Sequence, residues 1–391
     1  MGLRDQRLAI EWVASNIASF GGDPNRIQIL GQSSGGLAMG MQMLAYGGAQ
    51  GFPFHQVSAE SQILEGGITG NFTTKAMERI VSAAGCNNTD PQSASAIACL
   101  RALSTTQLLQ AQKTTHRSGP GANVGDEWLP MVDGDFLPSA PSQLISEGKF
   151  AHVPLLSGWC EDDTNPFVGT PKTEQDTHDY FTAYLPGMTA ANVKELLSLY
   201  PSSEFNANHA AGVPAQLYRA GRILRDILMV CQPIYFGTAL ANAGQPVYYW
   251  DQNQTMLGEV LTFLGEPGLG VVHTSNFAYE FANLSHYNVD GFPYNPNASD
   301  HALAKSQSRS WASFANSGMP SAKGLGTLEG WTPAFSGSNS SELNIFVIGG
   351  PQSGLSAWGG SNATNQALAD QKLAERCGFL TQPDIIAQLN F

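Results

Sequence analysis

The pentapeptide Gly31-Gln32-Ser33-Ser34-Gly35 constrains the fold more than any other segment of the chain. A short apolar run at 26–30 precedes it, and a segment rich in Leu, Met and Ala follows it at 37–45. We expect the first run to form a strand and the second a helix. A strand that turns this sharply into a helix needs small neighbours, which let the two elements approach and leave the serine hydroxyl exposed. The alternative is a glycine-rich turn whose serine has no chemical role.

Helix and strand patterns alternate along the rest of the chain. A helix is expected at 3–19, and further short strands are expected at 57–59, 153–158 and 246–250. Short buried strands between helices indicate an α/β fold with a mostly parallel central sheet flanked by helices. Residues 173–244 are mostly helical by pattern. We therefore predict one domain over residues 1–391, with residues 173–244 as a helical insertion or cap within it.

The charge of the chain excludes several classes of partner. Its 19 basic residues face 32 acidic ones, which gives a formal net charge of -13. Nucleic acid and anionic membrane surfaces need a cationic face, so neither is an expected partner. No run of 18 apolar residues occurs, and we expect no transmembrane segment. Cysteine and histidine spacings do not match a zinc site, so neither a metal nor a cofactor is expected.

Five cysteines and seven sequons suggest an oxidising compartment. Cys86 and Cys99 bracket a polar loop with a spacing suited to a local disulfide; two unrelated buried thiols are the alternative. The pairing of Cys160, Cys231 and Cys377 stays open. We expect a secreted, extracellular glycoprotein. Its candidate glycosylation sites are Asn71, Asn87, Asn253, Asn283, Asn297, Asn339 and Asn362.

A serine nucleophile needs a histidine base and an acid that orients it. His273 lies in a glycine-rich loop at 268–275 that follows the strand expected at 246–250. Glu161-Asp162-Asp163 directly follows the strand expected at 153–158. An ordinary structural histidine and a solvated acidic loop are the alternatives. The order serine, acid, histidine is the one expected of α/β-hydrolases.

Further motifs extend this pattern along most of the chain. They are Gly2-Leu3-Arg4-Asp5-Gln6, Phe20-Gly21-Gly22-Asp23-Pro24, Cys99-Leu100-Arg101, Pro130-Met131-Val132-Asp133-Gly134 and Trp311-Ala312-Ser313-Phe314-Ala315-Asn316-Ser317-Gly318. With the pentapeptide at Gly31, they resemble the type-B carboxylesterase/lipase family, which includes the cholinesterases. The resemblance runs from Gly2 to about Phe335.

The resemblance implies a role for each site residue. Ser33 takes the position of the nucleophile, with the backbone N–H of Ser34 as an oxyanion donor, and His273 that of the general base. The family's acid lies in a D-E-G-x-x-F segment, which matches residues 162–167 and places Asp163 at the acid position, with Asp where Glu is usual. Asp162 is the alternative acid.

The implied activity is hydrolysis of carboxylic esters, either small molecules or lipids, through an acyl-enzyme intermediate and without a cofactor. Two alternatives remain. One is a non-catalytic family member of the scaffold or adhesion type, and the other is an inactive truncated product.

The resemblance also implies that the N-terminal part of the family pattern is missing. In the family, the stretch upstream of Gly2 contains the first strands and a Gly-Gly loop that supplies other oxyanion donors. Without it we expect an exposed sheet edge, low solubility, and slower turnover than in an upstream-extended chain.

Overall fold

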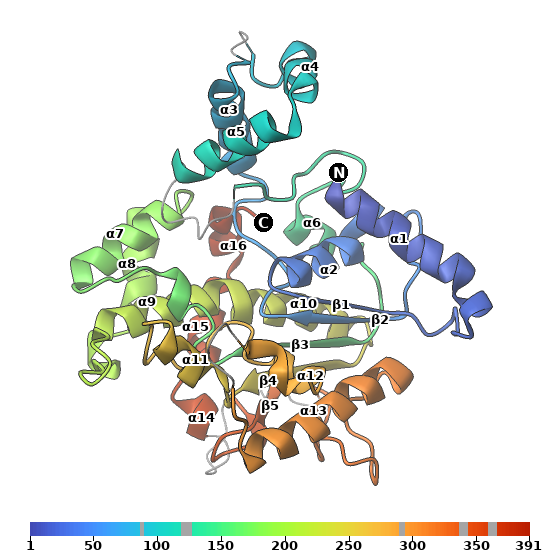
Figure 1. Ribbon diagram of the computed structural model, residues 1–391, viewed down its shortest axis with the longest axis vertical. Coiled ribbons are helices and arrows are strands. Elements are labelled where there is room, and N and C mark those ends of the chain that lie inside the picture. The colour runs from blue at the N-terminus through green and yellow to red at the C-terminus, as the bar shows by residue number, and fades with distance from the viewer. Residues whose placement is uncertain (87–89, 119–126, 289–293, 336–342, 359–365) are drawn as a thin grey trace.

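A six-stranded sheet forms the centre of the computed structural model, which describes residues 1–86, 90–118, 127–288, 294–335, 343–358 and 366–391. The spatial order of the strands follows the sequence, and helices cover both faces (Figure 1). The first five strands are parallel and the sixth is antiparallel to the fifth. This confirms the expected α/β class. The strands are β1 (Gln28–Gln32), β2 (Gln56–Glu60), β3 (Leu155–Cys160), β4 (Val247–Gln252), β5 (Asn344–Ile348) and β6 (Gly354–Ala357).

The helices alternate with the strands and add a separate group at one end of the molecule, where α3, α4 and α5 pack together (Figure 1). The helices are α1 (Gly2–Asn16), α2 (Ser34–Leu44), α3 (Phe72–Ala83), α4 (Ala94–Ala102), α5 (Thr105–Ser118), α6 (Pro141–Ser146), α7 (Glu174–Tyr184), α8 (Ala190–Ser198), α9 (Ala215–Arg225), α10 (Cys231–Asn242), α11 (Leu257–Phe263), α12 (Phe277–Glu280), α13 (Ala298–Ser317), α14 (Gln366–Ala369), α15 (Leu373–Leu380) and α16 (Pro383–Leu389).

The ends of the first elements differ slightly from those expected. β1 begins at Gln28 because Arg26 closes a turn on Asp23, to which it donates a backbone and a side-chain hydrogen bond. α1 ends at Asn16, and a 3₁₀ turn then runs to Gly21, whose φ of 83° ends the helical path. The sequence did not predict β5 and β6, which also belong to the sheet.

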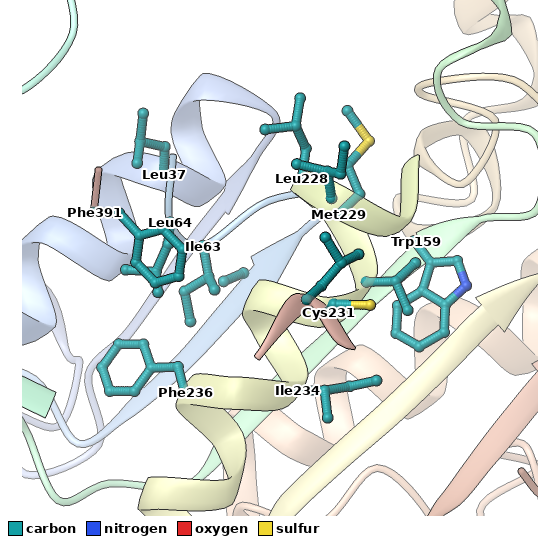
Figure 2. Packing of buried hydrophobic residues seen from close by; sticks show 14 of the residues in the cluster. Leu37, Ile63, Leu64, Trp159, Leu228, Met229, Cys231, Ile234, Phe236 and Phe391 are labelled. Atoms are coloured by element: carbon teal, nitrogen blue, oxygen red, sulfur yellow. The ribbon is translucent and has the colours of Figure 1, made fainter. Parts of the chain in front are cut away.

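Alternate residues of each strand pack into two different layers of the core. Val57, Leu155 and Val247 belong to the layer that α2 and α10 complete. Figure 2 shows part of this layer, in which Leu37 of α2 and Phe236 of α10 lie near the sheet. The opposite side chains, among them Leu156, Tyr248 and Trp250, pack against α13. The two-residue period of the strands therefore builds both layers at once.

Helices α7 to α10 form the connection between β3 and β4. α9 continues through a π-helical turn, Asp226–Val230, into α10, so that Ala215–Asn242 is one 28-residue helix. Among the described residues, it is the one helix whose length and composition would allow it to cross a membrane. However, 83% of the most apolar stretch of this helix is buried inside the fold, as in the core helix of a globular domain.

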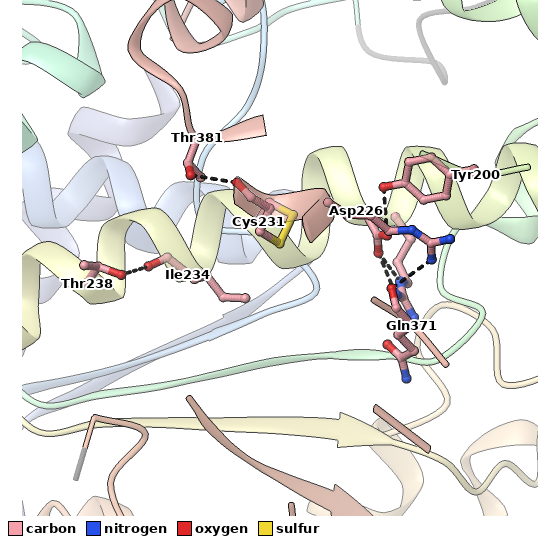
Figure 3. Close-up of a disulfide and its surroundings, with 10 residues drawn as sticks. Tyr200, Asp226, Cys231, Ile234, Thr238, Gln371 and Thr381 are labelled. Carbon is pink, nitrogen blue, oxygen red and sulfur yellow. Dashed lines mark hydrogen bonds and ion pairs between the residues drawn. A yellow bond between two sulfur atoms is a disulfide. The ribbon is translucent and has the colours of Figure 1, made fainter. Parts of the chain in front are cut away.

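Two disulfides join segments of the described chain. The expected bond between Cys86 and Cys99 is present, and Cys160 is free and buried. The second bond joins Cys231 at the start of α10 to Cys377 in α15, 146 residues away (Figure 3). The sequence left this pairing open, because the two cysteines come together only when the chain folds and places α10 beside α15.

We expect the second disulfide to stabilise the fold more than the first. Loop entropy gives about 5 kcal/mol for a loop of this length and about 3 kcal/mol for the Cys86–Cys99 loop. The double variant C231A/C377A should therefore lose more free energy of unfolding in urea than C86A/C99A does. An equal or smaller loss in C231A/C377A would contradict this ranking.

Candidate active site

Ser33 occupies a strained turn between β1 and α2. Its backbone has φ 61° and ψ −127°, a conformation that residues with side chains rarely adopt. A Cβ on Gly31 would lie 2.2 Å from the carbonyl oxygen of Gly35, and one on Gly36 would lie 2.4 Å from the carbonyl oxygen of Gln62. Glycine at these two positions therefore allows the close approach that the turn needs.

His273 and Asp163 form a close side-chain pair. Nδ1 of His273 lies 2.5 Å from Oδ1 of Asp163, and the backbone N–H of His273 donates to the carbonyl of Asp163 at 3.2 Å. Asp163 is fully buried, whereas the His273 side chain is 11% exposed. The ring of Phe167 meets the imidazole edge-on, with 5.1 Å between the ring centroids. The pair is therefore oriented by backbone, carboxylate and aromatic contacts together.

Each carboxylate of the Glu161-Asp162-Asp163 cluster has a different partner. Asp162 accepts a hydrogen bond from the Val271 N–H at 3.0 Å and so holds the loop before His273. Burial raises the pKa of the Asp162 carboxyl, and the charge of Arg222 opposes this shift. Glu161 accepts from the Asn253 side chain. The structure thus places Asp163, and not Asp162, against His273, and the cluster is not a solvated loop.

Gln32 lies against the imidazole of His273. Its Nε2 is 3.2 Å from Nε2 of His273. In the part of the chain that the structure describes, the side chains of Ser33 and His273 form no hydrogen bond with each other. A histidine whose Nδ1–H faces a carboxylate has its lone pair on Nε2. The Gln32 amide nitrogen is also 3.5 Å from Nδ1 of His273, so it contacts both ring nitrogens and does not lie along the Nε2 lone pair.

The backbone N–H groups of Ser33 and Ser34 have different roles. The Ser33 N–H donates to the carbonyl of Glu60 at 2.9 Å, which joins the turn to the end of β2. Ser34 is the first residue of α2, where N–H groups have no partner within the helix. Such a group can donate to a negative oxygen that develops beside Ser33. Together these groups could support nucleophilic chemistry at the serine.

Sequence reasoning missed several buried polar residues behind this site. Cys160 donates its backbone N–H to Oδ2 of Asp163 at 2.9 Å. Asn276, three residues after His273, is fully buried and bonds to the side chain of Glu60. The sequence did contain a signal for this network. Glu60 ends a strand expected to be buried, and a buried carboxylate needs polar partners.

The sequons differ in accessibility. Asn71, Asn283 and Asn297 are exposed, and Asn253 is half-buried with its amide bonded to Glu161. Three candidate sites lie outside the described residues: Asn87, Asn339 and Asn362.

Comparisons with known proteins point to one family. The model of the carboxylesterase family matches residues 1–361. A secreted lipase of Arthroderma benhamiae is 46% identical over 390 residues, covering 100% of this chain and 67% of that protein. An inactive carboxylesterase-like protein of Byssochlamys spectabilis is 29% identical, covering 86% of this chain and 59% of that protein. The chain thus spans about two thirds of the first relative and less of the second.

A solved structure supports the fold. EstA of Aspergillus niger superimposes with a TM-score of 0.75 at 20% identity, covering 100% of this chain and 70% of that one.

Replacement of Asp163 by asparagine should affect the reactivity of Ser33 much more than replacement of Asp162 does. Asp163→Asn should slow labelling by a fluorophosphonate about 10⁴-fold, because an amide stabilises the wrong tautomer of His273. Asp162→Asn keeps the acceptor for the Val271 N–H and should slow labelling less than 10-fold, by about the energy of one hydrogen bond. Labelling rates followed by intact mass test this, and equal losses would contradict the assignment of Asp163.

Proposed function

This chain belongs to the carboxylesterase family, and from that premise and the geometry of its site we propose that it is a serine carboxylic ester hydrolase. The observation that carries the proposal is the strained backbone of Ser33 at the N-terminus of α2, next to Gln32, whose amide lies 3.2 Å from the imidazole of the His273–Asp163 pair. Such strain persists where the surrounding structure enforces it, and it is concentrated at functional sites.

The proposed reaction has two steps. Ser33 Oγ attacks the ester carbonyl while Nε2 of His273 accepts its proton, and Asp163 stabilises the imidazolium that forms. The Ser34 N–H donates to the tetrahedral oxyanion. His273 then protonates the leaving alcohol, and it later activates the water that releases the acid from Ser33. No metal or cofactor takes part in these steps.

The described part of the chain contains a cleft lined by both polar and apolar side chains. The cleft has a volume of about 550 Å³, and its wall includes Phe72, Leu129 and Leu228. Its wall also includes polar side chains, among them Glu65, Asn71 and Gln388, and it does not include Ser33 or His273. We propose lipid esters and smaller carboxylic esters as candidate substrates, because several relatives are named lipases.

A secreted location fits this proposal. The relative from Arthroderma benhamiae is named a secreted lipase, and the two disulfides are typical of an oxidising compartment. We propose that the exposed sequons at Asn71, Asn283 and Asn297 carry glycans in the secreted protein.

The central experiment is covalent labelling with a fluorophosphonate, followed by peptide mapping. We expect the label on Ser33 and turnover of p-nitrophenyl esters that Ser33→Ala reduces by at least about 10³-fold. Ser310→Ala, a change at a buried serine of α13, is the matched control for loss of a hydroxyl. Persistent turnover in a folded Ser33→Ala variant would overturn the assignment.

A second candidate function is that of a non-catalytic family member. The contact of the Gln32 amide with the imidazole favours it, because in the described part of the chain the His273 side chain meets this amide and forms no hydrogen bond with Ser33. Absence of both label and turnover in the folded wild-type protein would support this candidate.

The two candidates differ in what they predict for Gln32→Ala. If the site is catalytic, loss of the amide contact leaves His273 free to turn toward Ser33 and should raise the labelling rate about 5-fold, the effect of one hydrogen bond of about 1 kcal/mol. If the site is non-catalytic, neither the wild-type protein nor Gln32→Ala is labelled. Gln28→Ala, on the same strand, is the control. A labelling rate that falls in Gln32→Ala would instead mean that the amide helps to orient the imidazole.

A further inference from the structure

Two buried carboxyl groups lie side by side behind the proposed site. Glu60 ends β2 and is fully buried, and Glu280 ends α12 and is 5% exposed. Their side chains are within hydrogen-bonding reach of each other. In the described part of the chain, neither forms an ion pair with a lysine or arginine. Two adjacent buried carboxylates without a cation cannot both remain charged, so one of them must hold a proton.

Asn276 bridges the two carboxyl groups. Its Nδ2 donates to Oε2 of Glu60 at 2.9 Å and also to Oε1 of Glu280. Its Oδ1 accepts from the thiol of Cys160, with 3.8 Å between sulfur and oxygen. All the hydrogen-bonding groups of the Asn276 side chain are therefore turned toward these three residues, which fixes its orientation.

The hydrogen-bond partners identify which carboxyl group holds the proton. Glu60 also accepts from Nε1 of Trp311 at 2.7 Å and from Oγ of Ser58 at 3.1 Å, so three donors surround it. Glu280 accepts only from Asn276, and its Oε2 has no partner among the described residues. A proton on that oxygen, donated to Glu60, would satisfy it. Burial raises the pKa of Glu280 well above its usual range, and the charge of Glu60 raises it further.

Other titratable groups around the network do not neutralise it. Cys160, Asp163 and Asp251 lie on or beside the neighbouring strands, and none of them carries a positive charge. Burial, followed by the charge of Asp163, raises the pKa of the Cys160 thiol, which therefore stays protonated and can donate to Asn276. A single negative charge on the pair is thus the arrangement that these neighbours favour.

The network reaches all three residues of the proposed triad. The carbonyl of Glu60 accepts from the Ser33 N–H, and Asn276 follows His273 by three residues. Cys160, which bonds to Asn276, donates its backbone N–H to Asp163. The segments that carry the serine, the acid and the histidine are therefore linked behind the site by buried hydrogen bonds.

We propose that protonated Glu280 donates a hydrogen bond to the Glu60 carboxylate, and that this pair acts through Asn276 as a positioning device that holds His273 in register with Ser33. None of these residues touches substrate, so they are positioning residues. The role in catalysis rests on the proposed ester hydrolysis, whereas the position of the proton and the orientation of His273 are properties of the folded protein.

Conservative and disruptive variants separate this role from simple packing. Glu280→Gln keeps a neutral donor toward Glu60 and an acceptor toward Asn276, and should retain kcat within about 3-fold. Glu60→Gln replaces one acceptor oxygen with a donor, so that either Asn276 or Trp311 loses its acceptor, and Glu280→Ala removes the donor to Glu60. Both should lower kcat about 10- to 100-fold with little change in KM, because small displacements of a catalytic group have effects of this size. Glu266→Gln, at an exposed glutamate, is the control.

A measurement that does not depend on turnover accompanies the kinetics. The Nδ1–H proton of His273, which faces Asp163, should give a downfield proton NMR signal. We expect Glu280→Gln to keep its position, and Glu60→Gln and Glu280→Ala to shift or broaden it. Unchanged signals in all three folded variants would overturn the proposal, as would a loss of kcat in Glu280→Gln equal to that in Glu280→Ala. If the wild-type protein hydrolyses no ester, the proposed function fails, and the NMR signals still decide whether the pair positions His273.

Discussion

The approach of α2 to the ends of β1 and β2 is the constraint on which the site depends. Ser33 can hold a φ of 61° only because its N–H is bonded to the carbonyl of Glu60 and because Gly31 and Gly36 leave room for neighbouring backbone. Strain of this kind costs about 1–3 kcal/mol, and the surrounding contacts must compensate for it. The layer of core that includes Leu37 supplies such contacts, since it presses α2 onto the sheet.

Polar groups behind this turn connect it by hydrogen bonds to α13 and to the other residues of the site. Glu60 is bonded to Trp311 of α13, so the helix that covers one face of the sheet also satisfies a carboxylate behind the site. Asn276 and Cys160 continue the contacts toward His273 and Asp163. Buried polar networks of this kind are stabilising only when their members are satisfied, and they then specify one arrangement of the surrounding elements. The carboxyl pair Glu60–Glu280 is consistent with that requirement when it holds one proton.

Helices α7 to α10 place another set of buried charges on the opposite side of β3. Arg225 and Asp226 pair at the π-helical turn, and the hydroxyl of Tyr200 donates to Asp226 at 2.9 Å (Figure 3). Arg225 also donates to the carbonyl of Glu161, next to the acidic cluster. Arg225, just before the irregular turn, thus lies at the end of β3, next to the turn that contains Asp163. A π-helical turn inside a long helix is often found beside functional sites, in agreement with this position.

The sequence by itself determined the local chemistry of this protein. The glycines around Ser33 predicted a strand-to-helix turn, and the alternating pattern predicted the α/β class, because both follow from backbone sterics and from periods of a few residues. β5 and β6 were not recognised, and β1 was shifted by two residues, since pairing with neighbours sets where a strand begins. Only the tertiary structure decided that Asp163 and not Asp162 meets His273, that Cys231 pairs with Cys377, and that Glu60 meets Glu280. The physical reason is that each of these contacts joins segments roughly one hundred residues or more apart, and no local propensity specifies how such segments pack.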